Sequence, residues 1–162
     1  VFILLLGMRI YFCGSIRAGR SDANLYKEII AKLSGYGEVL TEHIGLDEPW
    51  NAPHLCAFAS GQGSIDKDKC IFETDMNWLH SSNVVVAECT VPSLGVGFEL
   101  GVAWKLDLPT LVLYRPADAH VSGLSALIRG APSKKWHIVD YKGINDLDEY
   151  FTSFFTQYAP KK

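Results

Sequence analysis

The fold of this protein is decided by residues 83–101, which read NVVVAECTVPSLGVGFELG. The stretch opens with a near-continuous apolar run at residues 83–88, which is typical of a strand buried on both faces of a parallel sheet. Pro92 and Ser93 interrupt the run, and spaced apolar residues over 94–105 then predict a helix. A buried strand that passes through a short turn into a helix is the repeating unit of α/β proteins.

The same alternation of strand and helix runs along the rest of the chain. Strands are predicted at residues 9–13, 37–40, 83–88, 110–114 and 136–140. Helices are predicted at residues 24–34, 65–81, 94–105, 122–129 and 144–158. Because strands that alternate with helices form parallel sheets covered on both faces, we expect a five-stranded parallel sheet in a three-layer α/β sandwich of the flavodoxin/Rossmann-like class.

Length and charge limit the classes of function. The chain has 162 residues, which fits a single domain that we place at residues 8–162. Residues 1–7 form an apolar extension without a basic segment and too short to span a bilayer, so we expect neither a targeting signal nor a membrane partner. The 15 basic and 18 acidic residues give a formal net charge of −3, which argues against nucleic acid as a partner.

The cysteines and histidines form no recognisable disulfide or metal pattern. Cys13, Cys56, Cys70 and Cys89 lack a CxxC spacing and are typical of scattered thiols in a reducing compartment. None of the 5 histidines lies in an HExxH motif. We therefore expect a cytoplasmic or nuclear protein that uses no metal and no cofactor.

Polar residues follow the first predicted strand, at the edge of the sheet where α/β proteins bind ligands. Residues 14–20 read GSIRAGR and offer small residues, a hydroxyl group, two guanidinium groups and a helix start, all of which suit a phosphate group. An ordinary glycine-rich turn with exposed arginines is the alternative. The residues predicted to bind a substrate here are Gly14, Ser15, Ile16, Arg17, Gly19 and Arg20.

Glu99 is the candidate nucleophile in the segment that follows the third predicted strand. Its helix begins near Ser93 and Gly95, and the glycines there follow GxGxxxG rather than the GxGxxG of dinucleotide-binding proteins, which argues against NAD or FAD. A carboxylate in the first turns of a helix is stabilised in its ionised form by the helix dipole, as a nucleophile at neutral pH requires. The alternative is an ordinary acidic residue that favours a helix start.

Asp75 is the candidate partner of Glu99. It lies on the predicted helix before the third strand, one turn from Trp78, and faces the same cleft if both side chains point inward. Glycosidic cleavage uses two carboxyl groups, one to attack the anomeric carbon and one to exchange protons with the leaving group. The neighbouring acids Asp66, Asp68 and Glu73 more simply form a solvated helix face.

Three motifs resemble the nucleoside deoxyribosyltransferase-like family, and most closely its 2'-deoxynucleoside 5'-phosphate N-hydrolase branch. The motifs are YFCGSIRAGR at 11–20, TDMNWL at 74–79 and VVVAECTVPSLGVGFELG at 84–101. The likeness runs from residue 8 to about 141, includes LSALIRG at 124–130, and is lost across residues 45–63 and over the last helix. The connection at 45–63 is longer than a turn requires and is a candidate lid or base-binding loop.

The resemblance implies a role for each matching residue. It makes Glu99 the nucleophile that forms a deoxyribosyl ester, Asp75 the acid/base beside the leaving base, and Tyr11 the hydroxyl that orients Glu99. The other residues that it implicates contact the 5'-phosphate (Ser15, Arg17, Ser93), lie near the base (His43) or serve the partner's phosphate site across a homodimer interface (Ser125).

The predicted function is hydrolysis of 2'-deoxynucleoside 5'-monophosphates to free base and deoxyribose 5-phosphate through a glycosyl-Glu99 intermediate. The transferase branch of the family has an acidic residue where this chain has Ser93, and a carboxylate there would repel a phosphate group. Two alternatives stay open at this point, a nucleoside 2'-deoxyribosyltransferase that exchanges bases and a nucleotide-binding module without catalysis.

Overall fold

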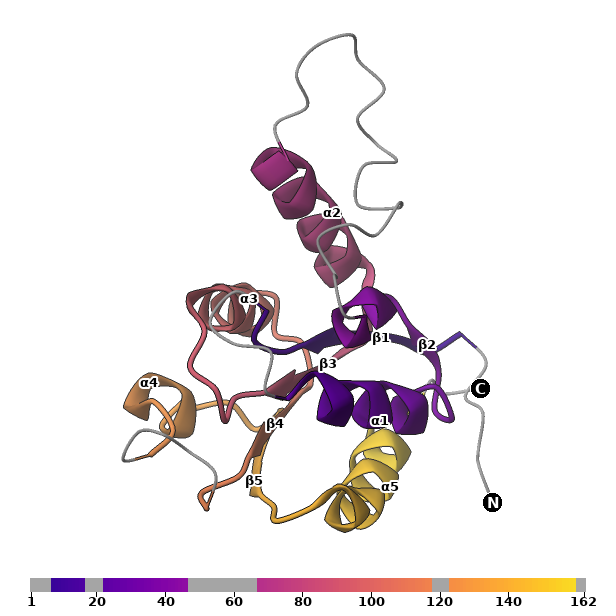
Figure 1. Ribbon diagram of the computed structural model, residues 1–162, viewed down its shortest axis with the longest axis vertical. Coiled ribbons are helices and arrows are strands. Elements are labelled where there is room, and N and C mark those ends of the chain that lie inside the picture. The colour runs from indigo at the N-terminus through magenta and orange to yellow at the C-terminus, as the bar shows by residue number, and fades with distance from the viewer. Residues whose placement is uncertain (1–6, 17–21, 47–66, 118–122, 160–162) are drawn as a thin grey trace, which may run out of the picture.

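A computed structural model describes residues 7–16, 22–46, 67–117 and 123–159, and within them it confirms the predicted fold class (Figure 1). All neighbouring strands pair in parallel, in the order β2-β1-β3-β4-β5. The strands are β1 (Arg9–Cys13), β2 (Glu38–Val39), β3 (Val84–Glu88), β4 (Thr110–Tyr114) and β5 (Trp136–Asp140). The second strand is shorter than the predicted 37–40 because only Glu38 and Val39 pair in register with β1.

Helices cover both faces of the sheet. They are α1 (Ala23–Leu33), α2 (Lys67–Ser81), α3 (Leu94–Lys105), α4 (Ala126–Arg129) and α5 (Leu147–Gln157), with 3-10 turns at Glu42–Gly45 and Ile144–Asp146. Figure 1 shows α1 and α5 on one side of the sheet and α3 on the other. The helix predicted at 122–129 is a single short turn in the described part, since Ser125 is its N-cap and residues 123 and 124 precede it.

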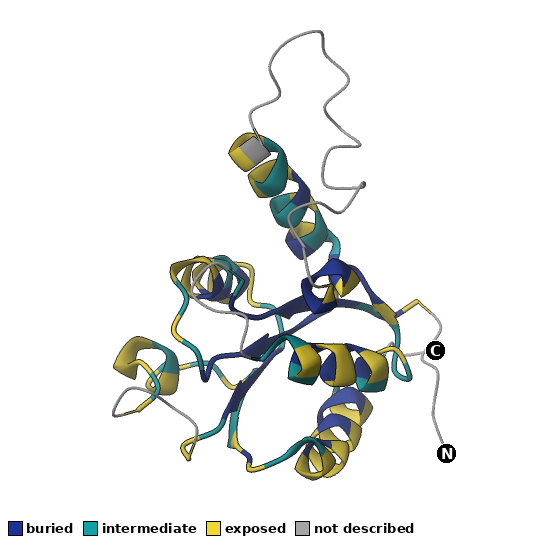
Figure 2. Ribbon diagram, viewed as in Figure 1, coloured by how far each residue is buried: buried dark blue, intermediate teal, exposed yellow. Residues whose placement is uncertain are grey.

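Figure 2 shows that the strands in the middle of the sheet are coloured as buried. The alternation of side chains along β1 and β3 divides this core into two layers. Ile10 and Phe12 point into the layer under α1 and α5, whereas Tyr11 and Cys13 point into the layer under α2 and α3. Every residue of β3 is buried, which confirms the strand predicted to be covered on both faces. The core thus places the Tyr11 side chain on the α3 side of the sheet.

The candidate site lies where the strand order reverses. From β1 the chain passes to β2 on one side, and β3 then lies on the other side of β1, with Cys13 level with Ala87. Such a switch point leaves a crevice at the carboxyl ends of the two strands. The segments that follow β1 and β3 therefore meet at this edge.

Two of the predictions fall largely outside the described residues. Residues 1–6 and 47–66 are not described, so the apolar extension and most of the 45–63 connection stay predictions. Within the described ranges, no helix combines the length and the apolar character needed to cross a bilayer.

Candidate active site

Glu99 lies on the face of α3 that packs against the sheet. The helix is capped by Ser93, whose side-chain oxygen accepts a 3.4 Å hydrogen bond from the backbone N–H of Val96. Val96, Leu100 and Ala103 are buried on the inner face, and Glu99 shares this face because residues three and four apart in a helix lie side by side. The helix therefore carries a carboxyl group into an apolar layer.

Tyr11 supplies a hydrogen bond to that carboxyl group. Its hydroxyl donates to Oε1 of Glu99 across 2.6 Å, and the tyrosine itself is completely buried in the centre of β1. A hydrogen bond donated to a carboxyl oxygen favours the ionised form of that group. The structure therefore brings together the two residues that the sequence paired, although they are 88 positions apart.

Asp75 joins the pair from α2. Its carboxyl group lies close enough for its charge to raise the pKa of both Glu99 and Tyr11. Thr74 and Leu79 of α2 are themselves buried. Burial also raises the pKa of Asp75, to about 7. Two carboxyl groups thus share one site, as the sequence predicts.

Burial also controls the ionisation of Glu99. The pKa of Glu99 is raised to about 8, because burial raises it most, the hydrogen bond from Tyr11 lowers it, and the charge of Asp75 raises it. Burial therefore opposes the ionised form that the helix dipole is expected to favour. Glu99 is six residues past the cap Ser93, and the dipole acts mainly over the first turn.

The cysteines near the site are not thiolates. Burial raises the pKa of Cys13 and of Cys89, and the charge of Glu99 adds to the shift in both. A thiol must ionise to act as a nucleophile. Cys13 therefore acts at most as a weak donor beside Glu99, whose pKa it lowers.

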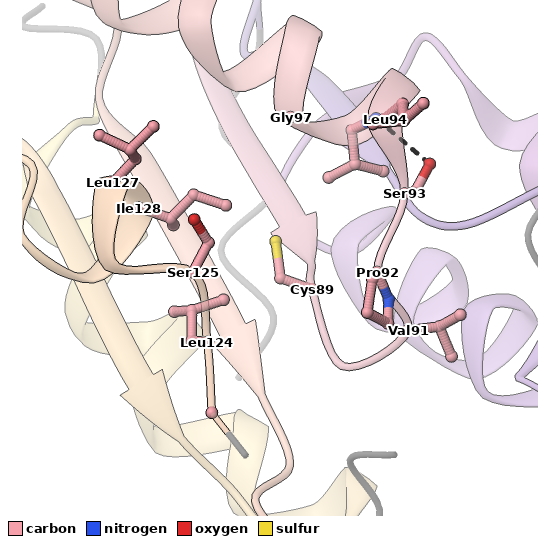
Figure 3. A pocket seen from close by; sticks show the side chains of 12 residues that line it. Cys89, Val91, Pro92, Ser93, Leu94, Gly97, Leu124, Ser125, Leu127 and Ile128 are labelled. Atoms are coloured by element: carbon pink, nitrogen blue, oxygen red, sulfur yellow. Dashed lines mark hydrogen bonds between the residues drawn. The ribbon is translucent and has the colours of Figure 1, made fainter. Parts of the chain in front are cut away.

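A cavity of about 610 Å³ separates the N-terminus of α3 from α4 (Figure 3). Ser93 and Ser125 line it from opposite sides, with Cys89 between them. Leu94 and Leu127 also line it, although 96% and 89% of their surfaces are exposed. Gly95 lies beside the cap, where an added Cβ would be 3.7 Å from Oγ of Ser93.

The segment after β1 leaves one buried hydroxyl group unsatisfied. Ser15 is completely buried, and its Oγ has no hydrogen-bond partner within the part of the chain that the structure describes. Its backbone N–H donates to the Tyr26 hydroxyl across 3.1 Å, and Gly14 packs so tightly on Tyr26 that an added Cβ would lie 3.0 Å from the ring. Ile16 is half-buried, while Arg17, Gly19 and Arg20 lie outside the described residues.

His43 lies in the 3-10 turn that follows β2. It is buried, and its ring centre is 5.6 Å from the ring centre of Trp78 on α2. Because Trp78 is one turn from Asp75, this contact places His43 on the side of the site formed by α2. Across the described residues, no group of three or more metal-ligating side chains comes together.

The sequence analysis missed a charged network behind these segments. Glu88 ends the apolar β3, and Arg115 directly follows the apolar β4. A charged residue at the carboxyl end of a buried strand is itself a signal, because such a side chain must find a partner in the structure. The two residues form an ion pair with a separation of 3.7 Å.

Coupled carboxyl groups beside a buried tyrosine, at the ligand-binding edge of a parallel sheet, are typical of the active site of an α/β enzyme. Residues 10–144 match the family described as nucleoside 2-deoxyribosyltransferase. The chain belongs to this family, which confirms the predicted resemblance and the expectation of an enzyme of the N-glycosidase type.

Individual relatives agree with this assignment. A 5-hydroxymethyl-dUMP N-hydrolase of Danio rerio is 47% identical over 149 residues, covering 89% of this chain and 96% of the relative. A protein of the same name from Rattus norvegicus is 43% identical over 154 residues, covering 94% of this chain and 88% of the relative. The structure of a CMP N-glycosidase from Clostridium botulinum shares the fold, with a TM-score of 0.50, 18% identity, and coverage of 89% of this chain and 98% of that one.

The raised pKa of Glu99 predicts a pH-dependent cost to stability. Between its ordinary pKa of 4.5 and its folded value of about 8, the folded protein retains a proton that the unfolded chain has lost. Rising pH over this range therefore lowers the free energy of unfolding. Since Glu99→Gln removes the titration, its melting temperature should exceed that of the wild type by a margin that grows from pH 5 to pH 9.

Differential scanning calorimetry across that range measures the margin. Glu149→Gln is the matched control, because it removes an exposed carboxylate of α5 that lies outside the site. A margin for Glu99→Gln that is the same at pH 5 and pH 9 contradicts a raised pKa of Glu99 in the folded protein.

Proposed function

We propose that this enzyme hydrolyses the N-glycosidic bond of 2'-deoxynucleoside 5'-monophosphates, with Glu99 as nucleophile. The observation that carries the proposal is the 2.6 Å hydrogen bond from Tyr11 to Glu99, with Asp75 coupled to both. The names of the relatives, which are N-hydrolases of a deoxynucleotide, support the same substrate class. The family assignment supports attack at the deoxyribose carbon.

The proposed reaction has two steps. An oxygen of Glu99 bonds to C1' as the bond from C1' to the base nitrogen breaks, and Asp75 donates its proton to the leaving base. Water then attacks C1', Asp75 takes a proton from it, and the ester bond to Glu99 breaks. The products are the free base and deoxyribose 5-phosphate, and both carboxyl groups return to their starting states.

Burial raises the pKa of both carboxyl groups, to about 8 for Glu99 and to about 7 for Asp75, so the pair gains and loses protons near neutral pH. The reactive form has Glu99 ionised and Asp75 protonated, which requires the shared proton to lie on Asp75 when substrate is bound. Tyr11 favours the ionised form of Glu99 and fixes its orientation, because its hydroxyl donates to one of the two carboxyl oxygens.

Ser15 supports recognition of the 5'-phosphate. The Ser15 hydroxyl is buried and has no hydrogen-bond partner among the described residues. Such a group costs free energy unless a ligand satisfies it, and phosphate oxygens are strong acceptors. The residues proposed to complete the phosphate site are Gly14, Ile16, Arg17, Gly19, Arg20, Ser93 and Gly95. A deoxyribosyltransferase that acts on uncharged nucleosides has no use for such a site, which makes base exchange the second candidate.

The enzyme is proposed to act as a homodimer in which Ser125 serves the partner's site. The nearly full exposure of Leu94 and Leu127 beside the Ser93 cavity supports a protein partner there, because large apolar side chains grouped on a surface mark interaction sites. Ser125 itself is exposed, and its side chain does not cap α4. It is therefore available to a ligand from either chain.

The catalytic assignment predicts unequal effects of two substitutions on release of base. Glu99→Gln should abolish nearly all turnover, whereas Asp75→Asn should slow it about 10²- to 10⁴-fold, the usual contribution of a general acid. Chromatography of the released base, with each dNMP and 5-hydroxymethyl-dUMP as substrates, measures both. Glu73→Gln on the exposed side of α2 is the control and should retain wild-type activity.

A substrate whose base leaves without protonation tests the role of Asp75 directly. Asp75→Asn should slow the cleavage of this substrate less than it slows the cleavage of a natural dNMP. Equal losses on both substrates mean that Asp75 does not transfer the proton, and substantial activity in Glu99→Gln removes the nucleophile assignment. Formation of a new nucleoside on addition of a second free base favours the transferase.

Phosphate recognition predicts a substrate-dependent effect of Ser15→Ala. The hydroxyl contributes only when the phosphate is present, so the substitution should raise KM for a dNMP about 10-fold and leave the corresponding nucleoside unaffected. Ser34→Ala is the control, since the Ser34 hydroxyl donates to the carbonyl of Ile30 in its own helix. Equal losses on nucleotide and nucleoside assign Ser15 to the fold instead.

The shared site predicts complementation between two defective chains. A heterodimer of Glu99→Gln and Ser125→Ala has one site with both defects and one site with neither, so verified heterodimers should recover about half of the wild-type activity. If Ser125 serves its own chain, every site in the heterodimer carries one defect and no activity returns. An active monomer in sedimentation at assay concentration also contradicts the proposal.

A further inference from the structure

A buried ionic network lies behind the two proposed substrate-binding segments. The guanidinium group of Arg115 pairs with the carboxylates of Asp22 and Glu88, and it lies over the Tyr141 ring at 5.8 Å from the centroid. The side chains of Arg115, Asp22 and Glu88 are only 13%, 15% and 0% exposed. Charges so far from solvent are rarely retained without a specific partner.

Two uncharged side chains also donate hydrogen bonds to Glu88 and complete the network. The Tyr141 hydroxyl donates to Oε1 of Glu88 across 3.1 Å, and the Thr90 hydroxyl donates to the same oxygen. Burial raises the pKa of Glu88, whereas these hydrogen bonds and the Arg115 charge lower it. Arg115 thus supplies the positive charge to which both carboxylates are fixed.

One branch of the network ends at the segment after β1. Asp22 lies two residues after the segment GSIRAGR, and its backbone carbonyl accepts a 2.9 Å hydrogen bond from the N–H of Tyr26 in α1. The Tyr26 hydroxyl in turn accepts from the N–H of Ser15. Ser15 and Asp22 are therefore both hydrogen-bonded to Tyr26, and Arg115 pairs with Asp22.

The other branch ends at the segment after β3. The backbone N–H of Arg115 donates to the Thr90 hydroxyl across 2.9 Å. Thr90 is three residues before Ser93, the cap of α3. Arg115 therefore contacts the segment before Ser93 with its backbone and the segment after Ser15 with its side chain.

We infer that Arg115 is a positioning residue that sets the distance between the segments carrying Ser15 and Ser93 and thereby the affinity for the 5'-phosphate. This inference rests on the proposed function. Asp22 and Glu88 orient the guanidinium group from two sides, and its planar fork fixes their relative position more firmly than a single ammonium group does. Neither the attacking group nor the proton donor belongs to the network, so the chemical step should be spared.

Substitutions that loosen the network should therefore weaken phosphate binding selectively. Arg115→Gln and the milder Asp22→Asn should each raise KM for dUMP about 10- to 100-fold, the scale of a loss of alignment, with kcat within about 2-fold of wild type. Activity on deoxyuridine should not change. Arg115→Lys should fall between wild type and Arg115→Gln, because it keeps the charge and loses the fork.

The control is Lys32→Gln, which removes an ion pair with Asp148 between α1 and α5 at a distance of 2.6 Å. It should alter neither KM nor kcat. Circular dichroism melts accompany each variant, and Asp22→Asn decides the outcome if Arg115→Gln does not fold. Equal losses of activity on dUMP and deoxyuridine, or an unchanged KM for dUMP, overturn the inference.

Binding without turnover separates this inference from the proposed function. Calorimetric titration of dUMP and deoxyuridine into Glu99→Gln, with and without Asp22→Asn, should show a 10- to 100-fold loss for dUMP alone. That loss supports the inference whether or not the wild type releases base. If the wild type releases no base, only the proposed hydrolysis is contradicted. If Asp22→Asn leaves the affinity for dUMP unchanged, the inference is overturned even if hydrolysis is established.

Discussion

The site depends on one costly feature, a carboxyl group carried by α3 into the apolar layer beneath it. Among the described residues, the groups that set the pKa of Glu99 are Tyr11, Asp75 and Cys13, none of which is a cation. Burial without a cation raises its pKa to about 8, and the 2.6 Å hydrogen bond from Tyr11 opposes the shift. The fold supplies this geometry because β1 presents Tyr11 to the layer that also receives Leu100 and Ala103 of α3.

A second pair of carboxylates, Glu88 and Asp22, differs from the first because a cation lies between them. Arg115 pairs with both, and Tyr141 and Thr90 donate to Glu88, so this network is fixed by charge. The carboxyl end of the sheet therefore holds two kinds of acidic group. One pair has pKa values raised toward neutral pH and suits proton transfer, and the other is paired with a cation and suits the positioning of loops.

Much of this arrangement could be predicted from the sequence. The spacing of apolar residues located the strands and helices, and their alternation indicated a parallel sheet between two layers of helices. The apolar run at Val84–Glu88 predicted a doubly covered strand, and family motifs paired Tyr11 with Glu99. The effect of burial on the pKa of Glu99 was not predicted because a helix position does not reveal how much solvent surrounds a side chain. The Arg115 network was missed because Asp22 and Arg115 lie 93 positions apart and meet only in the folded chain.

The most direct test of the account is to trap the bond between Glu99 and the sugar. Acid quenching of the wild type during turnover of a dNMP, followed by peptide mass spectrometry, should show one deoxyribose 5-phosphate on the peptide that contains Glu99, at the same time as a burst of free base. The adduct should be absent from Glu99→Gln. Free base released without any adduct, or an adduct on a different residue, would contradict the assignment of Glu99 as the nucleophile.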